Sequence, residues 1–208
     1  MQLNEKKSNV MIFNYTRNYQ FSTRIHLNNS LLETIGETKL LGTIISSDLT
    51  WHKNSKFLTQ KGYQRMTILR NLYEFDIPLE DLVLIYTMYI RSILEYNSNV
   101  WFSSITEEEK ENLERVQSVA CKIILKEEYI SYEQALHYLN LQTLEERRQI
   151  LALRFAKKCA KSDSFCNLFP KNVNRNLRNP DEYRVKFAST GRLKHSSIPA
   201  LQRLLNNN

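Results

Sequence analysis

The side chains best suited to chemistry are carboxylates, and the densest group of them is Glu107-Glu108-Glu109. Consecutive carboxylates can hold a cation, but these follow Thr106, a residue type that often begins a helix. Acidic side chains in a first helical turn are stabilised by the helix dipole. Asp76 and Asp81 lie on either side of Pro78. Two-metal chemistry requires paired acids, and neither aspartate has a partner acid on a hairpin. We therefore interpret the triplet as a helix start and predict no metal site.

Histidine, cysteine and glycine patterns do not indicate a catalytic site. The four histidines are scattered, without a second histidine or a cysteine at zinc-ligand spacing. The three cysteines are an odd number, which favours small buried hydrophobic residues in a reducing compartment. The chain has no glycine-rich phosphate loop, and no local motif marks a Ser or Cys nucleophile. We expect no cofactor and no small-molecule substrate.

The positive charge is concentrated near the C-terminus. The chain has 29 Lys and Arg against 22 Asp and Glu, a net charge of +7. Residues 171–208 contain eight basic and two acidic residues, whereas the other 170 contain 21 and 20. A basic segment of this kind either contacts a nucleic-acid backbone or is solvated, and we favour contact. The candidate contacts in it are Arg175, Arg178, Arg184, Lys186, Arg192, Lys194 and Arg203.

Aromatic side chains could stack on bases, but most belong to the expected core. Tyr86, for example, lies on the apolar stripe between Val83 and Ile90.

The composition predicts a mostly helical α+β chain. Only 4 Gly and 4 Pro interrupt the 208 residues, and 42% are hydrophobic. Four short apolar runs in the first fifty residues predict strands, and Asn28-Asn29 is expected to close a hairpin. These runs are residues 10–13, 24–27, 31–35 and 40–45.

After Trp51 the apolar residues recur with helical spacing, and three sequence patterns mark helix starts. The patterns are capping boxes at Thr106, Ser131 and Thr143, each with Glu or Gln three residues later. We expect a small antiparallel β segment in 1–50, a helical domain in 51–170 and a loosely ordered basic tail in 171–208. The tail is predicted to hold one last helical turn, at Ala200 to Leu205.

The sequence predicts an intracellular protein, nuclear or cytoplasmic, and not a secreted one. No apolar run approaches the ~18 residues that a membrane span needs, so no membrane partner is expected. Polar residues follow Met1, where a signal peptide would have an apolar stretch.

Several segments, in order, resemble the C-terminal part of the reverse transcriptase of non-LTR, LINE-type, jockey-like retrotransposons. The resemblance covers nearly the whole chain, and no single motif in it is specific. The matching segments are Leu3-Asn4-Glu5-Lys6-Lys7-Ser8, Val10-Met11-Ile12-Phe13, Lys39-Leu40-Leu41-Gly42, Leu49-Thr50-Trp51, Ile93-Leu94-Glu95-Tyr96, Val100-Trp101, Leu113-Glu114-Arg115-Val116-Gln117, Ala135-Leu136, Leu141-Gln142-Thr143-Leu144-Glu145-Glu146-Arg147-Arg148 and Ser197-Ile198-Pro199.

The resemblance implies the end of a polymerase palm, a helical thumb and the tail of the polyprotein. Lys7 matches the lysine of polymerase motif D, which is thought to donate a proton to the leaving pyrophosphate. The segment with Lys39, Leu41 and Gly42 resembles the primer grip, and the helices after Trp51, beginning near Lys53, resemble the thumb that closes over template and primer. The family usually has a histidine three residues after the tryptophan, and this chain has Asn54 there.

The family's catalytic aspartates, which hold two Mg²⁺ ions, belong to motifs upstream of motif D, and no Asp precedes Asp48 here. We expect a transposable-element fragment with no cofactor of its own and no polymerase activity alone, which retains binding to RNA or an RNA–DNA duplex. The missing polymerase regions are a second expected partner. The alternative is a degenerate helical protein-interaction domain without nucleic-acid function.

Overall fold

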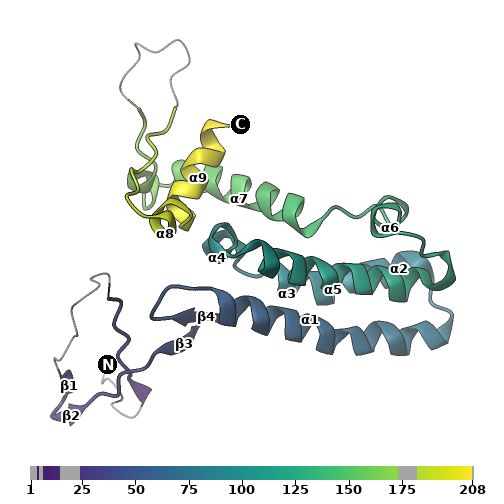
Figure 1. Ribbon diagram of the computed structural model, residues 1–208, viewed down its shortest axis with the longest axis horizontal. Coiled ribbons are helices and arrows are strands. Elements are labelled where there is room, and N and C mark those ends of the chain that lie inside the picture. Colours follow the sequence, from purple (N-terminus) through teal and green to yellow (C-terminus); the bar gives the residue numbers. More distant parts are fainter. Residues whose placement is uncertain (1–3, 5–6, 15–23, 173–181, 208) are drawn as a thin grey trace. The chain divides into compact units, whose positions relative to one another are not determined.

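The computed structural model of the protein describes residues 4, 7–14, 24–172 and 182–207 (Figure 1). The chain divides into two compact units, Met1–Ser55 and Lys56–Asn208. The fold is mostly helical, with two antiparallel sheets of two strands each, so the predicted mostly helical α+β class is confirmed.

A short hairpin in the first unit pairs β1 (His26–Leu27) with β2 (Ser30–Leu31). Its turn residues, Asn28 and Asn29, have φ values of 46° and 69°. A two-residue hairpin turn of this type needs positive φ at both central positions, which asparagine tolerates well. The predicted Asn28-Asn29 hairpin is confirmed.

A second hairpin replaces the single strand predicted over 40–45. Strand β3 (Glu37–Leu40) pairs with β4 (Thr43–Ser46), and Leu41 and Gly42 form the turn with φ values of 46° and 85°. The prediction of one strand was wrong because residues 40–45 form an apolar run without alternation, in which a turn that begins with leucine gives no sequence signal. Leu41 is 81% exposed at the tip.

Two contacts join this hairpin to the first turn of α1 (His52–Leu72) within the first unit. The buried Asn54 side chain accepts a hydrogen bond from the Ile44 backbone amide through Oδ1, at 3.1 Å. The Lys53 ammonium group pairs with the Glu37 carboxylate. Asn54 thus has a structural role in this chain, since it fixes the second hairpin to α1.

The second unit is built from helices, most of which pack through one apolar face. The predicted helix after Pro78 is one continuous segment whose middle, η3, is π-helical. Short 3₁₀ turns connect several of the other helices. After α1, the elements are η2 (Tyr73–Phe75), α2 (Leu79–Ile85), η3 (Tyr86–Arg91), α3 (Ser92–Leu94), α4 (Ser98–Trp101), η4 (Phe102–Ser104), α5 (Glu107–Leu125), η5 (Lys126–Glu128), α6 (Tyr132–Tyr138), α7 (Leu144–Ala160), η6 (Cys166–Leu168), α8 (Gly191–Lys194) and α9 (Ser197–Asn206).

Helices α1 and α5 approach closely at Gly62. A Cβ atom at this position would lie 2.7 Å from Cγ1 of Val116 and 3.1 Å from Cδ2 of Leu94. Glycine in a helix interior costs about 1 kcal/mol relative to alanine, so here it is explained by packing. The buried residues Leu58, Met66 and Leu69 continue the same face of α1.

Capping boxes begin α5 and α7 as the sequence predicts. The Thr106 hydroxyl accepts from the Glu109 amide at 3.3 Å, and Glu109 Oε2 accepts from the Thr106 amide at 2.8 Å. Thr143 and Glu146 repeat the arrangement at α7. Glu107-Glu108-Glu109 therefore forms the first turn of α5, which agrees with our interpretation of the triplet as a helix start.

A buried polar network ties α5 to its neighbours. Gln117 of α5 accepts from the Tyr86 hydroxyl at 2.6 Å and donates to the Tyr132 hydroxyl at 2.8 Å. Tyr132 donates to Glu114, whose carboxylate also accepts from the Leu144 amide at the start of α7, at 3.1 Å. Burial raises the pKa of both tyrosines, which keeps them protonated as donors.

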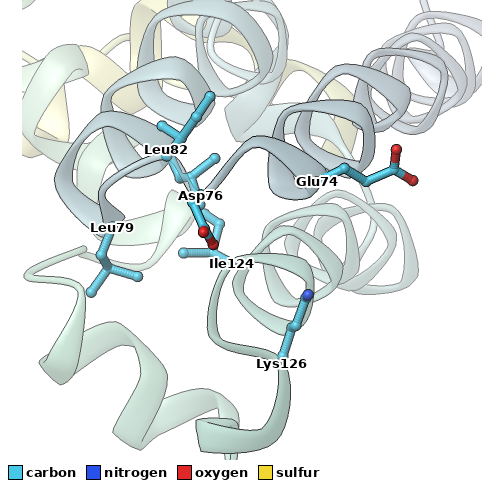
Figure 2. Close-up of a pocket in the computed structure, with 7 residues that line it drawn as sticks. Glu74, Asp76, Leu79, Leu82, Ile124 and Lys126 are labelled. Carbon is cyan, nitrogen blue, oxygen red and sulfur yellow. The ribbon is translucent and has the colours of Figure 1, made fainter.

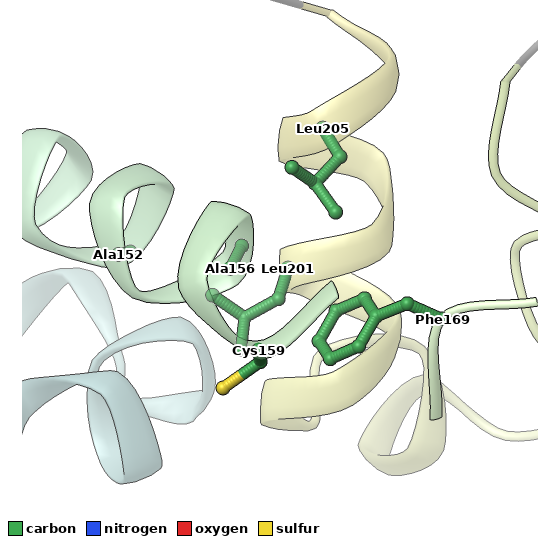
Figure 3. Packing of buried hydrophobic residues seen from close by; sticks show 6 residues of the cluster. All are labelled: Ala152, Ala156, Cys159, Phe169, Leu201 and Leu205. Carbon is green, nitrogen blue, oxygen red and sulfur yellow. The ribbon is translucent and has the colours of Figure 1, made fainter. Parts of the chain in front are cut away.

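The C-terminal helix α9 packs on α7 and closes a second cluster of apolar side chains (Figure 3). Leu201 and Leu205 of α9 meet the small residues Ala152, Ala156 and Cys159 of α7. Only one helical turn was expected here, and the structure has a helix of ten residues. The sequence did not predict the length of this helix because the segment around it is rich in polar residues. Two leucines four residues apart are enough to pack α9 against α7, because α7 presents small side chains to them.

Candidate nucleic-acid interface

The predicted cations of the C-terminal segment surround α8 and α9. Arg184 and Lys186 lie in the segment between residues 182 and 187, which we call the basic strap, and both are exposed. Arg192 and Lys194 lie on α8 and are exposed as well. Arg175 and Arg178 lie outside the described residues.

Side-chain amides of α9 hold the basic strap in place. The Asn206 carboxamide bonds both backbone groups of Tyr183, accepting from its N–H and donating to its carbonyl, each at 2.9 Å. Gln202, which is buried, accepts from the Lys186 amide at 2.8 Å and donates to the Leu168 carbonyl at 2.7 Å. Burial alternates along the strap: Tyr183 and Val185 are partly buried, whereas Arg184 and Lys186 are exposed.

Arg203 has a different role from the other tail cations. Its guanidinium group donates to the Lys194 carbonyl and so joins α9 to the end of α8. A positive charge near the last carbonyls of a helix is stabilised by the helix dipole.

The primer-grip candidates belong to the first unit. Lys39 lies on β3 and is exposed, Leu41 and Gly42 form the turn of the second hairpin, and Lys53 is paired with Glu37. Lys7 is exposed in a short turn in which its amide donates to the Asn4 carbonyl at 3.1 Å.

The most basic helix in the described part of the chain was not singled out from the sequence. Helix α1 carries five Lys or Arg residues and no Asp or Glu over 21 residues. The signal was visible in the sequence, but summing charge over residues 1–170 hid it behind the acids of the later helices. The five cations are Lys53, Lys56, Lys61, Arg65 and Arg70.

Three of these cations face solvent without an acidic partner in the described chain. Lys56, Lys61 and Arg70 are exposed, and Lys61 donates to Gln64 at 3.0 Å. Arg65 is instead held against Tyr89 of η3, with its guanidinium carbon 4.1 Å from the ring centroid and a 2.6 Å hydrogen bond to the Tyr89 carbonyl. We call the set Lys56, Lys61 and Arg70 the α1 basic face, although the three are spread around the solvent-exposed side of the helix and do not form a single row.

A pocket of about 490 Å³ lies between η2, α2 and the end of α5, and none of these cations lines it (Figure 2). Its polar lining comes from Glu74, Asp76 and Lys126, and its apolar lining from Leu79, Leu82 and neighbouring residues. In Figure 2 the Glu74 carboxylate lies apart from that of Asp76. The two acids do not converge on a common point, so we assign no cation site there.

The described residues do not fit the Mg²⁺ pair of a polymerase. No group of three or more His, Cys, Asp or Glu side chains in this part of the chain could hold a metal ion. We therefore derive no metal-dependent step.

Three comparisons with known proteins give no match: none with a family model, none with a curated protein and none with a solved structure. Within the described residues, no helix has the length and apolar character that crossing a bilayer requires.

Proposed function

We propose that this chain binds RNA or an RNA–DNA duplex through the phosphate backbone, in the manner of the thumb of a LINE-type reverse transcriptase. The observation that carries the proposal is the α1 basic face, where a long helix presents cations and no acids. The resemblance described above supports the same function, since α1 follows Trp51, where the family's thumb helices begin.

The dimensions and chemistry of α1 suit a duplex backbone. A helix of 21 residues is about 30 Å long, which spans several phosphates of a duplex strand. Between the cations, the exposed side chains Gln60, Gln64 and Thr67 are amide and hydroxyl donors of the kind that contact phosphates. Such contacts position a duplex without reading its sequence.

The C-terminal segment adds positive charge that is not balanced by acidic residues in the same segment. Residues 183–208 contain five cations and no acid. The only acid of the described strap, Glu182, is paired with Lys171 at 3.1 Å. The tail cations therefore extend the surface that attracts a polyanion.

The test is a salt titration of duplex binding by the whole chain. Fluorescence anisotropy with a labelled RNA–DNA duplex at 50 to 300 mM salt should show an affinity that falls steeply, because each neutralised phosphate contributes a slope of roughly −0.9 in log K against log salt. Absence of binding at the lowest salt, or binding that salt does not change, would refute the proposal. Deleting residues 171–208 is not a suitable test, because Leu201 and Leu205 belong to the core.

The proposal includes no catalysis by this chain alone. Lys7 resembles a proton donor of motif D, but we propose no reaction for it without a positioned nucleotide. A primer-extension assay with Mg²⁺ and a primed RNA template should give no product, and reproducible extension would contradict this part.

A protein-interaction function is the second candidate, and exposed apolar side chains favour it. Leu84 and Met88 lie one helical turn apart across α2 and η3, and Val100 of α4 is also exposed. The partner would be the fingers and metal-binding palm regions of a LINE-type reverse transcriptase. Adding those regions in trans, after nuclease treatment, should give a complex that Met88→Glu weakens if this function is correct.

A further inference from the structure

A second pocket, of about 460 Å³, lies beside the basic strap, and its walls are of two kinds. One wall is apolar and comes from the segment that contains α8 and the start of α9. The other comes from the strap and is cationic and aromatic. The residues on which the argument depends are Arg184, Lys186, Phe187, Leu193, Ile198 and Pro199.

Phe187 is the most exposed large hydrophobic side chain in the described chain, at 88%. It follows Lys186, whose backbone amide donates to the buried Gln202, so the backbone that carries the ring is tied to α9 beside the pocket. An aromatic ring that the fold holds in solvent, rather than buries, has a face available for stacking.

The charge around Phe187 selects an anionic ligand. Arg184 and Lys186 line the same pocket, and no acidic residue lines it. An exposed aromatic ring combined with cations along one strand of backbone is the arrangement that binds single-stranded nucleic acid, with bases on the ring and phosphates on the cations. A base in a duplex is stacked between its neighbours, so its face is not free to take up this position.

We infer that this pocket takes an unpaired nucleotide of a single strand, with its base against Phe187 and its phosphates on Arg184 and Lys186. The apolar wall of Leu193, Ile198 and Pro199 receives the other side of the base or the sugar. The inference rests on the proposed function and extends it, since the preferred ligand becomes a duplex with a single-stranded extension.

The experiment compares three labelled ligands by anisotropy: a blunt RNA–DNA duplex, the same duplex with a five-nucleotide extension, and the extension strand alone. The wild-type chain should bind the extended duplex at least about fivefold more tightly than the blunt one, because a base stacked on an aromatic ring contributes roughly this much or more. Phe187→Ala should remove that gain and leave blunt-duplex affinity unchanged, whereas Phe187→Trp should keep it.

Phe75→Ala is the matched control, since Phe75 is also highly exposed, at 72%, and does not line the pocket. It should leave the preference for the extended duplex intact. Equal binding of blunt and extended duplexes by the wild type overturns the inference and leaves the proposed function standing. Binding of the extension strand without the blunt duplex supports the pocket and contradicts the duplex proposal, and failure of all three ligands to bind overturns both.

Discussion

Helices α1 and α7 each carry five Lys or Arg residues, but α7 uses two of its five in packing, whereas on α1 only Arg65 is partly buried. On α1 most of the cations are on the solvent side. On α7 the two arginines of the N-terminal half point toward the protein interior. This helix also has two acidic residues of its own. The difference shows that the number of cations on a helix does not give the number that a ligand could reach, because some of them are used in packing.

The α7 arginines are part of the packing. Arg147 forms a bidentate ion pair with Glu95, in which Nη2 of Arg147 lies 3.1 Å from Oε2 of Glu95. Arg148 is 1% exposed and lies against the rings of Trp101 and Phe102. Its guanidinium carbon is 5.5 Å from the Trp101 ring centroid and 5.2 Å from the Phe102 ring centroid. Burial lowers the pKa of Arg148 to about 10, because the charged form is poorly solvated there.

Removing the Arg148 side chain gives the largest expected change in stability. Arg148→Ala should lower the free energy of unfolding by about 3 kcal/mol, because it leaves a cavity between two aromatic rings. Lys61→Ala on α1 should stay within about 0.5 kcal/mol. Urea unfolding followed by circular dichroism measures both.

Arg148→Met separates the size of this side chain from its charge. Nε and Nη1 of Arg148 are buried without a hydrogen-bond partner in the described structure, so methionine should recover most of the loss. A methionine variant as unstable as the alanine variant would show that the charge itself stabilises the fold.

The buried face of α1 should be as sensitive as that of α7. Gly62→Ala is expected to cost about 2 kcal/mol, because the new Cβ would overlap the fully buried Val116 side chain. Thermal unfolding of Gly62→Ala, Val116→Ala and the double variant tests this. The double variant should be more stable than the sum of the single changes predicts, and simple additivity would argue against the close approach.

The Glu95–Arg147 pair should contribute less. Glu95→Gln keeps the shape of the side chain and removes its charge, and we expect a loss of about 1 to 2 kcal/mol because both side chains are largely buried. An unchanged unfolding midpoint in urea would mean that Arg147 is held by packing alone.

The smallest effect is a pH dependence from Cys121 of α5. Burial raises the pKa of its thiol to about 12, from an ordinary value near 9. The thiol therefore contributes stability that is present below pH 9 and is lost as the pH rises toward 12. Between pH 8 and pH 10, the stability of the wild type relative to Cys121→Ala should fall by about 1 kcal/mol. A constant difference over this range would contradict the buried thiol.

The sequence predicted the elements whose signals are local. Capping residues at Thr106 and Thr143, the Asn28-Asn29 turn and the apolar stripe of α1 each specify structure over a few residues. The turn at Leu41-Gly42 escaped prediction because leucine rarely adopts positive φ. Helix α9 was underestimated because its stability depends on small residues of α7 about fifty positions earlier.

The candidate interface was predicted only in part. The tail cations followed from local charge, but only the structure shows that Arg203 bonds a backbone carbonyl and that Gln202 and Asn206 hold the strap. The α1 basic face was present in the sequence as a run without acids. Its significance depends on which cations face solvent, and that is set by packing.

Charge reversal on the two compared helices tests the central claim most directly. Lys56→Glu with Lys61→Glu changes the α1 basic face, and Lys157→Glu with Lys158→Glu makes the same change in net charge on exposed positions of α7. We predict that the α1 pair weakens RNA–DNA duplex binding at least tenfold and flattens its salt dependence, while the α7 pair changes affinity less than about threefold. Equal weakening by both pairs would show that the duplex responds to net charge alone, and would contradict a binding surface on α1.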